Sequence, residues 1–451
     1  MSSSKTYDKY KNVKHELFDQ IPAHWELFKA SHLFDNIGSG TTPKSDKQEY
    51  YENGDVSWLT TGDLNDNNLT SCDGKITRKA LEEHSALKEY PEGSIAIAMY
   101  GATIGKTAIL QFRTTTNQAC CVFSASSKIH NKYFHYQLLS LKPYILSLAV
   151  GGGQPNINQE ILRSLKITVP KNKEQLFIAN FLDRETAKID SLIAEQESLI
   201  ELLKEKRQAL ISHAVTKGLN PDAQMKDSGV EWLGEVPEHW EETNIKRISK
   251  IYGRIGFRGY TVDDIVDEGD GAIALAPGNL EEKGFSLEKK TYISWKKYEE
   301  SPEIMIKQGD VLLVKTGSTF GKCCYVDRLN EAATLNPQMV VFKEIIPENE
   351  FFYYQLRSAY VQAVIQNMNK GSALPTVTQE AIGSIKLFVP PINEQQSILE
   401  QLSKTLIGNE ELLDNSRKAI SLLSERRSAL ISAGVTGQID VRNLSPEEAT
   451  S

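Results

Sequence analysis

The sequence predicts an α+β fold, in which two strand-rich mixed α/β domains in pseudo-twofold arrangement are separated by two long antiparallel coiled-coil helices. The first observation behind this prediction is an internal repeat, because the same motifs occur twice in the same order. The second is a change of pattern within each copy. Short apolar runs broken by glycine, proline and asparagine give way to a proline-free stretch whose apolar residues recur at heptad spacing.

Repeated motifs define the two copies, which are displaced by about 215 to 220 positions. Units of this size are far larger than the repeats of a solenoid, so they predict a duplicated architecture. The matched pairs are IPAHWE at 21–26 and VPEHWE at 236–241, GATIGK at 101–106 and GSTFGK at 317–322, and LLKEKRQALIS at 202–212 and LLSERRSALIS at 422–432.

The change of pattern indicates where the segments begin and end. Strand-like runs such as 95–98 and 311–314 belong to globular parts, and each proline-free stretch is typical of one helix, roughly 60 Å long at 1.5 Å per residue. The predicted segments are an N-terminal segment at 1–20, a first globular domain at 21–170, a first spacer helix at 171–218, a linker at 219–235, a second globular domain at 236–390, a second spacer helix at 391–434 and a C-terminal tail at 435–451.

Heptad spacing predicts the residues through which the two helices pair. We expect them to pair mainly with each other, in antiparallel orientation; the alternative is that each packs only on its own globular domain. Polar residues at Gln196, Lys206, Asn409, Ser416 and Arg426 would select one register at some loss of stability. The predicted interface residues are Leu182, Ile189, Leu192, Leu199, Leu203 and Leu210 in the first helix, and Leu402, Leu412, Ala419, Leu423 and Leu430 in the second.

Composition limits the class of protein. The chain has 451 residues, 40% of them hydrophobic and 24% charged, which suffices for two or more globular units. No apolar run approaches the roughly eighteen residues that span a bilayer, so we expect a cytoplasmic protein with no membrane partner. The five cysteines lack zinc-binding spacing and are expected to be buried thiols. The net charge of −8 gives no overall basic character, although an acidic chain can carry a basic face.

The stretch GATIGKT at 101–107 is not expected to bind ATP. A phosphate-binding loop needs four residues between its first glycine and the Gly-Lys-Ser/Thr group, and only three separate Gly101 from Gly105. The residues after Thr107 are strand-like, whereas a phosphate loop opens a helix. In the second copy Cys323 replaces the hydroxyl residue. The pattern therefore predicts a glycine turn between two strands.

Catalytic chemistry is not predicted for this chain. An amino-methyltransferase that flips its base needs an Asn-Pro-Pro-aromatic motif, and the nearest stretch, NPQM at 336–339, lacks the second proline and the ring. The sequence shows no convincing set of carboxylates and lysine for metal-dependent DNA cleavage. His24 and His239 occupy equivalent positions in the repeated Pro-x-His-Trp motif, which favours a packing or turn role. We expect a non-catalytic chain without metal or cofactor of its own.

Four motifs of the chain form a recognisable set. They are DSGVEWLGEVPEHW at 227–240, GSTFGK at 317–322, VPPINEQ at 389–395 and RSALISAGVTGQID at 427–440. Any one motif alone would be weak evidence, but as a set they resemble the specificity subunit of type I restriction-modification enzymes. The resemblance extends from about residue 8 to residue 442.

The resemblance implies two target-recognition domains, each recognising one half of a split DNA sequence, held apart by two helices. It also implies that two copies of an adenine methyltransferase subunit bind the chain, and that a DNA-translocating, DNA-cutting ATPase subunit joins them. S-adenosylmethionine, ATP and Mg²⁺ would then belong to those partners. The half-sites of the double-stranded DNA are expected to differ, because the first domain carries IGSGTTP at 37–43 and the second carries YGRIGFRGY at 252–260.

Six basic residues are candidates for contacting DNA. Arginine can pair bidentately with guanine, and lysine mostly neutralises phosphate. Taken singly, each could equally be a solvated surface charge, and the two lysines of the repeated glycine turn favour a framework role. We expect two or three of the six to contact DNA. They are Lys44, Lys47, Arg254, Arg258, Lys106 and Lys322.

A second class of function stays open on the sequence alone. The chain could be a coiled-coil scaffold whose two globular domains bind protein partners, and its acidic net charge favours this reading. The differing sequences of the two domains argue against it, because a scaffold with a twofold framework gains from identical ends.

Overall fold

The computed structural model describes residues 6–15, 17–150, 155–254, 259–281, 284–368 and 375–442. The chain forms two compact units. Unit 1 comprises residues 1–196 and 418–451, and unit 2 comprises residues 197–417. These units cross the predicted segments, because each contains one globular domain together with part of both long helices.

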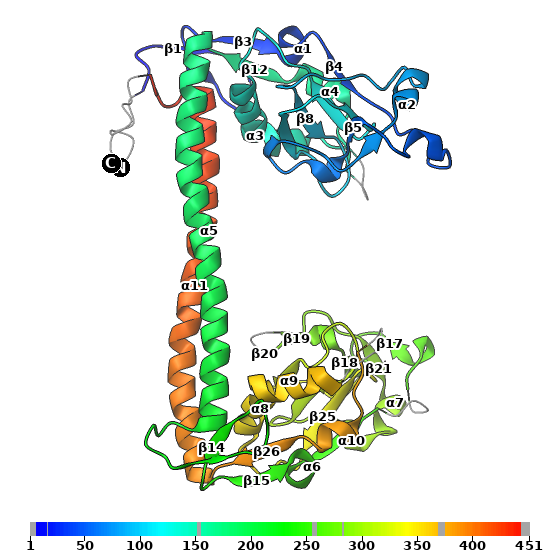
Figure 1. Cartoon of the computed structure of the whole chain (residues 1–451), viewed down its shortest axis with the longest axis vertical. Coiled ribbons are helices and arrows are strands. Elements are labelled where there is room, and N and C mark those ends of the chain that lie inside the picture. Colours follow the sequence, from blue (N-terminus) through cyan, green and yellow to red (C-terminus); the bar gives the residue numbers. More distant parts are fainter. Residues whose placement is uncertain are drawn as a thin grey trace. The chain divides into compact units, whose positions relative to one another are not determined.

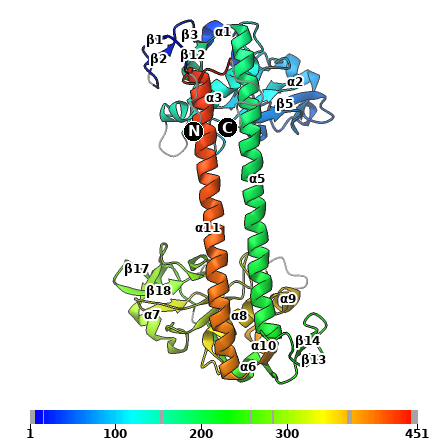
Figure 2. The ribbon, with the colours of Figure 1, turned by 90° about the vertical axis from the view of Figure 1, so that its left-hand side faces the viewer.

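The two longest elements are α5 (Asn172–Lys217) and α11 (Ile392–Thr436), which have 46 and 45 residues. Within each unit they lie side by side (Figure 1, Figure 2). In unit 1 the helices approach closely at Gly434, where a Cβ atom would lie 3.2 Å from Leu182. Further along α5, Asp190 pairs with Arg427, which precedes Gly434 in α11. The contacts therefore move toward higher residue numbers in α5 as they move toward lower residue numbers in α11, so the helices run antiparallel.

The helices pair through a seam that departs from the predicted one at alternate steps. Leu192, Leu199 and Leu412 were predicted to lie in the interface, and this is wrong because their exposed fractions are 45%, 40% and 51%. The residue that follows each of them is less exposed, since Ile193 and Ile200 are half-buried and Leu413 is buried. The other predicted residues are buried or half-buried: Leu182, Ile189, Leu203, Leu210, Leu402, Ala419, Leu423 and Leu430.

The error has a physical cause. A heptad alternates steps of three and four residues, and the sequence places an apolar side chain at both possible positions, 192 and 193 for example. The seam therefore passes from Ile189 to Ile193 rather than to Leu192. Arg207 and Arg427 likewise replace the predicted Lys206 and Arg426, which are exposed.

Polar side chains on the seam form specific contacts. Asn409 is 6% exposed and its Nδ2 donates to the carbonyl oxygen of Leu203 at 3.2 Å. In unit 1, Arg427 Nε lies 2.7 Å from Asp190, and in unit 2, Arg207 lies 3.5 Å from Glu410. The internal repeat relates Asp190 to Glu410 and Arg207 to Arg427, so the two ion pairs are one interaction formed twice.

Domain 1, the globular part of unit 1, is built on a five-stranded sheet in the order β4-β11-β8-β9-β6, in which only β6 and β9 are parallel. A smaller sheet has the order β10-β5-β7, and β12 pairs with β3. The elements are β3 (Glu26–Lys29), α1 (Ala30–Leu33), β4 (Ile37–Ser39), β5 (Val56–Leu59), β6 (Asn67–Leu69), β7 (Lys75–Ile76), α2 (Arg78–Glu83), β8 (Ile95–Ala98), β9 (Thr107–Leu110), β10 (Thr115–Thr116), β11 (Cys120–Phe123), α3 (Asn131–Ser147), α4 (Gln159–Ser164) and β12 (Lys166–Val169).

Domain 2, the globular part of unit 2, repeats this plan with sheets in the orders β16-β25-β22-β23 and β17-β21-β18-β24, while β19 pairs with β20 and β15 with β26. Its elements are β15 (Glu241–Asn244), α6 (Ile245–Ile248), β16 (Lys250–Gly253), β17 (Ile265–Val266), β18 (Gly271–Leu275), β19 (Leu280–Glu281), β20 (Gly284–Phe285), β21 (Tyr292–Ser294), α7 (Trp295–Glu299), β22 (Val311–Val314), β23 (Cys323–Tyr325), β24 (Ala333–Leu335), β25 (Met339–Lys343), α8 (Asn349–Arg357), α9 (Ala359–Met368), α10 (Gln379–Gly383) and β26 (Lys386–Val389).

A hairpin precedes each domain. In unit 1, β1 (Tyr10–Asn12) pairs with β2 (Gln20–Pro22), and in unit 2, β13 (Met225–Asp227) pairs with β14 (Glu235–Pro237). Residues 219–235 were expected to be a linker, but they contain most of the second hairpin, and Leu233 packs into the core of unit 2. The hairpin belongs to the repeated unit, which is why both copies have one.

The corrected seam makes a stability prediction. Replacing Leu413 by alanine should lower the free energy of unfolding by about 2–4 kcal/mol, because its side chain is 1% exposed and its removal leaves a cavity. The neighbouring Leu412→Ala is the matched control and should cost less than about 1 kcal/mol. Urea unfolding followed by helical circular dichroism measures both. A larger loss of unfolding free energy from Leu412→Ala than from Leu413→Ala would support the register predicted from sequence instead.

Candidate nucleic-acid interface

The same carboxylate contact fixes each domain to the beginning of a long helix. In unit 1, Glu174 in the first turn of α5 accepts hydrogen bonds from Trp25 Nε1 at 3.0 Å and contacts His24 Nε2 at 2.9 Å. In unit 2, Glu394 in the first turn of α11 accepts from Trp240 Nε1 at 3.1 Å, and His239 Nε2 lies 2.7 Å from it. The histidines of the repeated motif therefore hold the helix start in place.

A glutamine beside each glutamate completes this attachment. Gln175 accepts a hydrogen bond from the backbone N–H of His130 at 2.7 Å and donates to the carbonyl oxygen of Pro170 at 2.9 Å. Gln395 makes the same two contacts in unit 2, with the N–H of Glu348 and the carbonyl oxygen of Pro390, both at 2.8 Å. Both amides are buried, so leaving either bond unmade would be costly. We call the Glu-Gln pair and its Trp-His partners the helix clamp.

The GATIGKT stretch is the predicted glycine turn between two strands. It joins β8 to the antiparallel β9, with Gly105 N–H donating to the carbonyl oxygen of Ala98 at 2.9 Å. Gly101 and Gly105 have φ angles of +84° and +75°, a region that favours glycine. In unit 2, the turn between β22 and β23 has the same geometry. Thr107 is 1% exposed, so its hydroxyl is buried and does not face an open loop.

The structure places the predicted DNA-contacting residues in different environments. Lys44 and Lys47 are both exposed on the loop after β4, where Lys47 Nζ lies 3.1 Å from the Tyr50 hydroxyl. In the glycine turns, Lys106 Nζ donates to Asn65 Oδ1 at 3.1 Å, and Lys322 Nζ donates to the carbonyl oxygen of Leu280. The two turn lysines therefore contact the framework of their own domains. Arg258 lies outside the described residues.

Arg254 was a candidate DNA contact from sequence, but its side chain is buried inside domain 2. Its side chain is 3% exposed, Nε donates to the carbonyl oxygen of Leu335 at 2.9 Å and Nη2 donates to Thr334 Oγ1 at 3.1 Å. The guanidinium also lies 5.7 Å from the centre of the Tyr260 ring. Burial lowers the pKa of the Arg254 guanidinium. The flanking glycines suggested an exposed loop, but the neighbouring strands cover the side chain.

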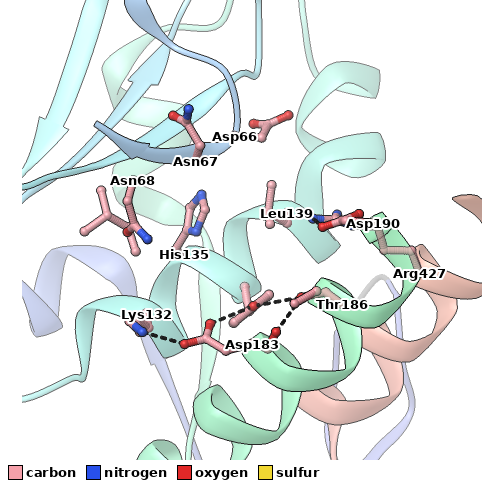
Figure 3. Close-up of a pocket in the computed structure, with 13 residues that line it drawn as sticks. Asp66, Asn67, Asn68, Lys132, His135, Leu139, Asp183, Thr186, Asp190 and Arg427 are labelled. Carbon is pink, nitrogen blue, oxygen red and sulfur yellow. Dashed lines mark hydrogen bonds and ion pairs between the residues drawn. The ribbon is translucent and has the colours of Figure 1, made fainter. Parts of the chain in front are cut away.

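A polar cavity that sequence reasoning missed lies in unit 1 between domain 1 and the helices (Figure 3). Its volume is about 330 Å³, and α3, β6, β9, α5 and α11 supply its walls. Asp183 on α5 accepts hydrogen bonds from Lys132 at 2.5 Å and from the Tyr136 hydroxyl at 2.8 Å, both on α3. No single motif contains these residues, because the cavity forms only when five separate elements meet.

His135 on α3 is a buried neutral base in the wall of this cavity. Its Nε2 lies 2.9 Å from Thr107 Oγ1, which in turn donates to Asp66 Oδ1 at 3.0 Å. Since the single hydroxyl proton is used toward Asp66, Nε2 of His135 must carry a proton and donate. Burial lowers the pKa of His135 to about 4. Lys142 pairs with Asp66 at 2.7 Å and holds the pKa of that carboxyl below its ordinary value despite its partial burial.

The repeat places larger side chains at the corresponding positions of unit 2. Tyr353 corresponds to His135 and Arg357 to Leu139, and Arg357 Nη1 donates to the Tyr353 hydroxyl at 2.8 Å. The backbone carbonyl of Arg357 accepts a hydrogen bond from Gln208 of α5 at 2.6 Å. Each domain therefore meets its helix pair through its own set of side chains, although the helix clamp is the same.

Among the residues that the structure describes, no group of three or more His, Cys, Asp or Glu side chains is arranged to hold a metal ion. Within the same ranges, no helix is both long enough and apolar enough to cross a bilayer. All five cysteines are free and buried, as predicted, and burial raises the pKa of the Cys121 and Cys323 thiols to about 12.

The sequence matches the family described as Type I restriction modification DNA specificity domain twice, over residues 22–202 and 237–420. It is 23% identical over 430 residues to the MjaVIII specificity subunit of a type I restriction enzyme from Methanocaldococcus jannaschii, covering 94% of this chain and 95% of that protein. The MjaIX specificity subunit of the same organism is also 23% identical, with 94% and 96% covered.

Among solved structures, the fold is similar to a chain from work on complex assembly and conformational transition of the type I R-M system. The TM-score is 0.69 at 12% sequence identity, and the match covers 93% of this chain and 99% of that chain. At this identity the similarity shows a shared fold.

The buried histidine predicts a pH dependence of stability. Because the folded pKa of His135 is about 4, below the ordinary 6.5, the unfolded chain binds its proton more readily between these values. Its stabilising contribution is therefore full above about pH 6.5 and is lost as the pH falls toward 4, by about 2 kcal/mol at pH 5. His135→Gln should remove this part of the pH dependence of urea unfolding. The exposed His32→Gln is the control, and an equal flattening in both variants would contradict the assignment.

Proposed function

Because this chain belongs to the Type I restriction modification DNA specificity domain family and contains two of its domains, we propose that it recognises an asymmetric bipartite DNA target. Each domain recognises one half-site, and the chain directs adenine methylation and restriction by partner subunits. As a specificity subunit of this family it is itself non-catalytic. The observation that carries the proposal is the repeated helix clamp, which attaches two domains of different surface to their helices in one way.

An asymmetric target is supported by differences at equivalent positions. The strands β4 and β16 occupy the same place in the two domains, but the loop after β4 carries Lys44 and Lys47, whereas the chain after β16 begins with the buried Arg254. The framework contacts are shared and the loops are not. Different loops on one framework favour different half-sites.

A fixed gap between the half-sites is supported by the helices. Each of α5 and α11 is one continuous helix that contributes to both units. A rigid element between two DNA-binding modules converts a fixed distance in the protein into a fixed number of base pairs. We propose that the paired helices act as such an element.

Two copies of one partner, the adenine methyltransferase subunit, are supported by a duplicated set of exposed leucines. Unit 1 carries Leu192 and Leu422, and unit 2 carries Leu202 and Leu412, with exposed fractions from 45% to 64%. The repeat relates Leu192 to Leu412 and Leu202 to Leu422, so each unit has one leucine from each helix. Large apolar side chains exposed together mark protein interaction sites. An identical pair in each unit matches two identical partners.

In unit 1, Leu192 and Leu422 lie on the flank of the helix pair that domain 1 leaves open. Leu192 immediately precedes the seam residue Ile193, whereas Asp183, which bonds α3 of domain 1, immediately follows the seam residue Leu182. Residues before and after the seam lie on opposite flanks of a helix. A methyltransferase subunit can therefore dock without displacing the domain. The restriction ATPase subunit would join this core, and S-adenosylmethionine, ATP and Mg²⁺ would be bound by the partners.

The DNA contacts remain proposals, residue by residue. Lys44 and Lys47 are the strongest of the six, because both are exposed on a loop that differs between the domains. Lys106 and Lys322 are weaker, since both bond to their own frameworks. The scaffold alternative is disfavoured, because the family matches cover both domains and describe DNA specificity.

A genome-wide map of adenine methylation, with and without this chain, tests the proposed function. Deleting the gene should abolish methylation at one bipartite, asymmetric motif, which would also reveal both half-sites and the gap. Restoring the gene should restore the motif. If purified complex with its methyltransferase subunit methylates DNA with no bipartite preference, the proposal is wrong.

Replacing Lys44 by alanine tests the proposed phosphate contact. Binding should weaken by a similar factor on every sequence, and the slope of log K against log salt should become shallower by about 0.9. Lys128→Ala is the control, because Lys128 lies 3.4 Å from Asp35 and is not a candidate. Fluorescence anisotropy over a salt series measures both. An unchanged slope in the Lys44 variant would remove this residue from the interface.

A further inference from the structure

At one equivalent structural position, domain 1 has a glycine with no room for a side chain and domain 2 has a large side chain. In domain 1, Ser39 of β4 pairs with Cys121 of β11, and in domain 2, Gly253 of β16 pairs with Val340 of β25. The segment CCVF at 120–123 corresponds to MVVF at 339–342, so Cys121 and Val340 are counterparts. The residues that directly follow β4 and β16 are therefore counterparts as well. They are Gly40 in domain 1 and Arg254 in domain 2.

Domain 1 has no room for a side chain at this position. A Cβ atom on Gly40 would lie 1.7 Å from the carbonyl oxygen of Thr116 in β10, far inside contact distance. The N–H of Gly40 donates to Thr116 Oγ1 at 3.0 Å. The backbone itself thus attaches the beginning of the loop to the smaller sheet.

Domain 2 makes the same attachment through a side chain. The strand β24, which pairs in parallel with β18, is the counterpart of β10, which pairs in parallel with β5. Arg254 reaches β24 with two hydrogen bonds, to the carbonyl oxygen of Leu335 and to Thr334 Oγ1. The planar guanidinium, with several donors in fixed directions, can bond one strand and still offer a face to an aromatic ring.

The Arg254 guanidinium also contacts an aromatic ring in the chain that follows it. The guanidinium of Arg254 lies 5.7 Å from the centre of the Tyr260 ring, which is half-buried. Directly after Tyr260, Asp264 accepts a hydrogen bond from the N–H of Thr261 at 2.8 Å and closes a short helical turn. Arg254 therefore connects the smaller sheet of domain 2 to residues 259–264, a connection that glycine cannot make in domain 1.

We propose that Arg254 is a positioning residue for DNA recognition by domain 2: it touches no base, and it holds residues 259–264 where they contact the second half-site. The proposal rests on the proposed function above. It predicts that losing the guanidinium relaxes base preference in one half-site only, because domain 1 has its own attachment at Gly40.

The test is the methylation map of cells that carry Arg254→Met with the intact complex. Preference for the favoured base at one or more positions of the second half-site should fall at least tenfold, while preferences in the first half-site stay unchanged. Arg254→Lys should recover part of the preference, because an ammonium retains the charge but not the fork. Lys343→Met is the matched control. It breaks a largely buried ion pair elsewhere in domain 2, with Asp310 at 2.6 Å, and should lower methylation without changing base preferences.

Each outcome decides the matter. Unchanged preferences in folded Arg254→Met overturn the inference, and so do preferences relaxed equally in both half-sites. If Arg254→Met does not fold, Tyr260→Leu decides in its place, with relaxation confined to the second half-site expected and unchanged preferences contradicting it. A wild-type map without any bipartite motif would instead defeat the proposed function.

Discussion

The contact on which the rest of the structure depends is made by the carboxylate in the first turn of each long helix, which is buried at Glu174 and half-buried at Glu394. Glu174 and Glu394 each accept a hydrogen bond from a fully buried tryptophan and contact the histidine before it. A negative side chain in the first turn is also favoured by the helix dipole. In unit 1 the Tyr7 hydroxyl donates to Glu174 at 2.8 Å, so the clamp also holds the N-terminal segment. One interaction thus joins hairpin, domain and helix.

Because the clamp is the same in both units, the differences between the domains are confined to other positions. His135 and Tyr353 occupy one such position and Gly40 and Arg254 another, and in each pair the two residues make different contacts. The glycine turns and their lysines, in contrast, are framework in both copies. Duplication has kept the helix clamp and has changed side chains elsewhere in the domains. This division is what an asymmetric target requires.

Much of this arrangement could be predicted from sequence, because repetition and periodicity are properties of the chain itself. The strand-to-helix change, the glycine turn and alternate seam positions such as Leu182 and Leu203 follow from local pattern. Local pattern could not decide whether Leu412 or Leu413 lies on the seam, because both are apolar and only packing against the partner helix distinguishes them. The burial of Arg254 could not be predicted for a related reason. A glycine-flanked arginine is typical of an exposed loop, and its burial depends on β24, which is distant in sequence.

The polar cavity of unit 1 shows the same limit in another form. Asp183 lies on α5, while Lys132 and Tyr136 lie on α3, and no single motif contains all three. They meet only because α3 of domain 1 packs beside α5. Sequence reasoning finds the clamp motifs but not the geometry that they impose.

The most direct test of two interchangeable, identically clamped domains is a chimera in which residues 26–171 replace residues 241–391. Ser403→Asp, the counterpart of Asp183, would supply a partner for Lys132 in the transplanted domain. The measurement is the motif methylated by the chimera with its methyltransferase subunit. The account predicts an inverted repeat whose two halves are both the half-site of domain 1, because a twofold protein recognises a palindrome. Methylation of the original asymmetric motif, or of a direct repeat, would contradict it.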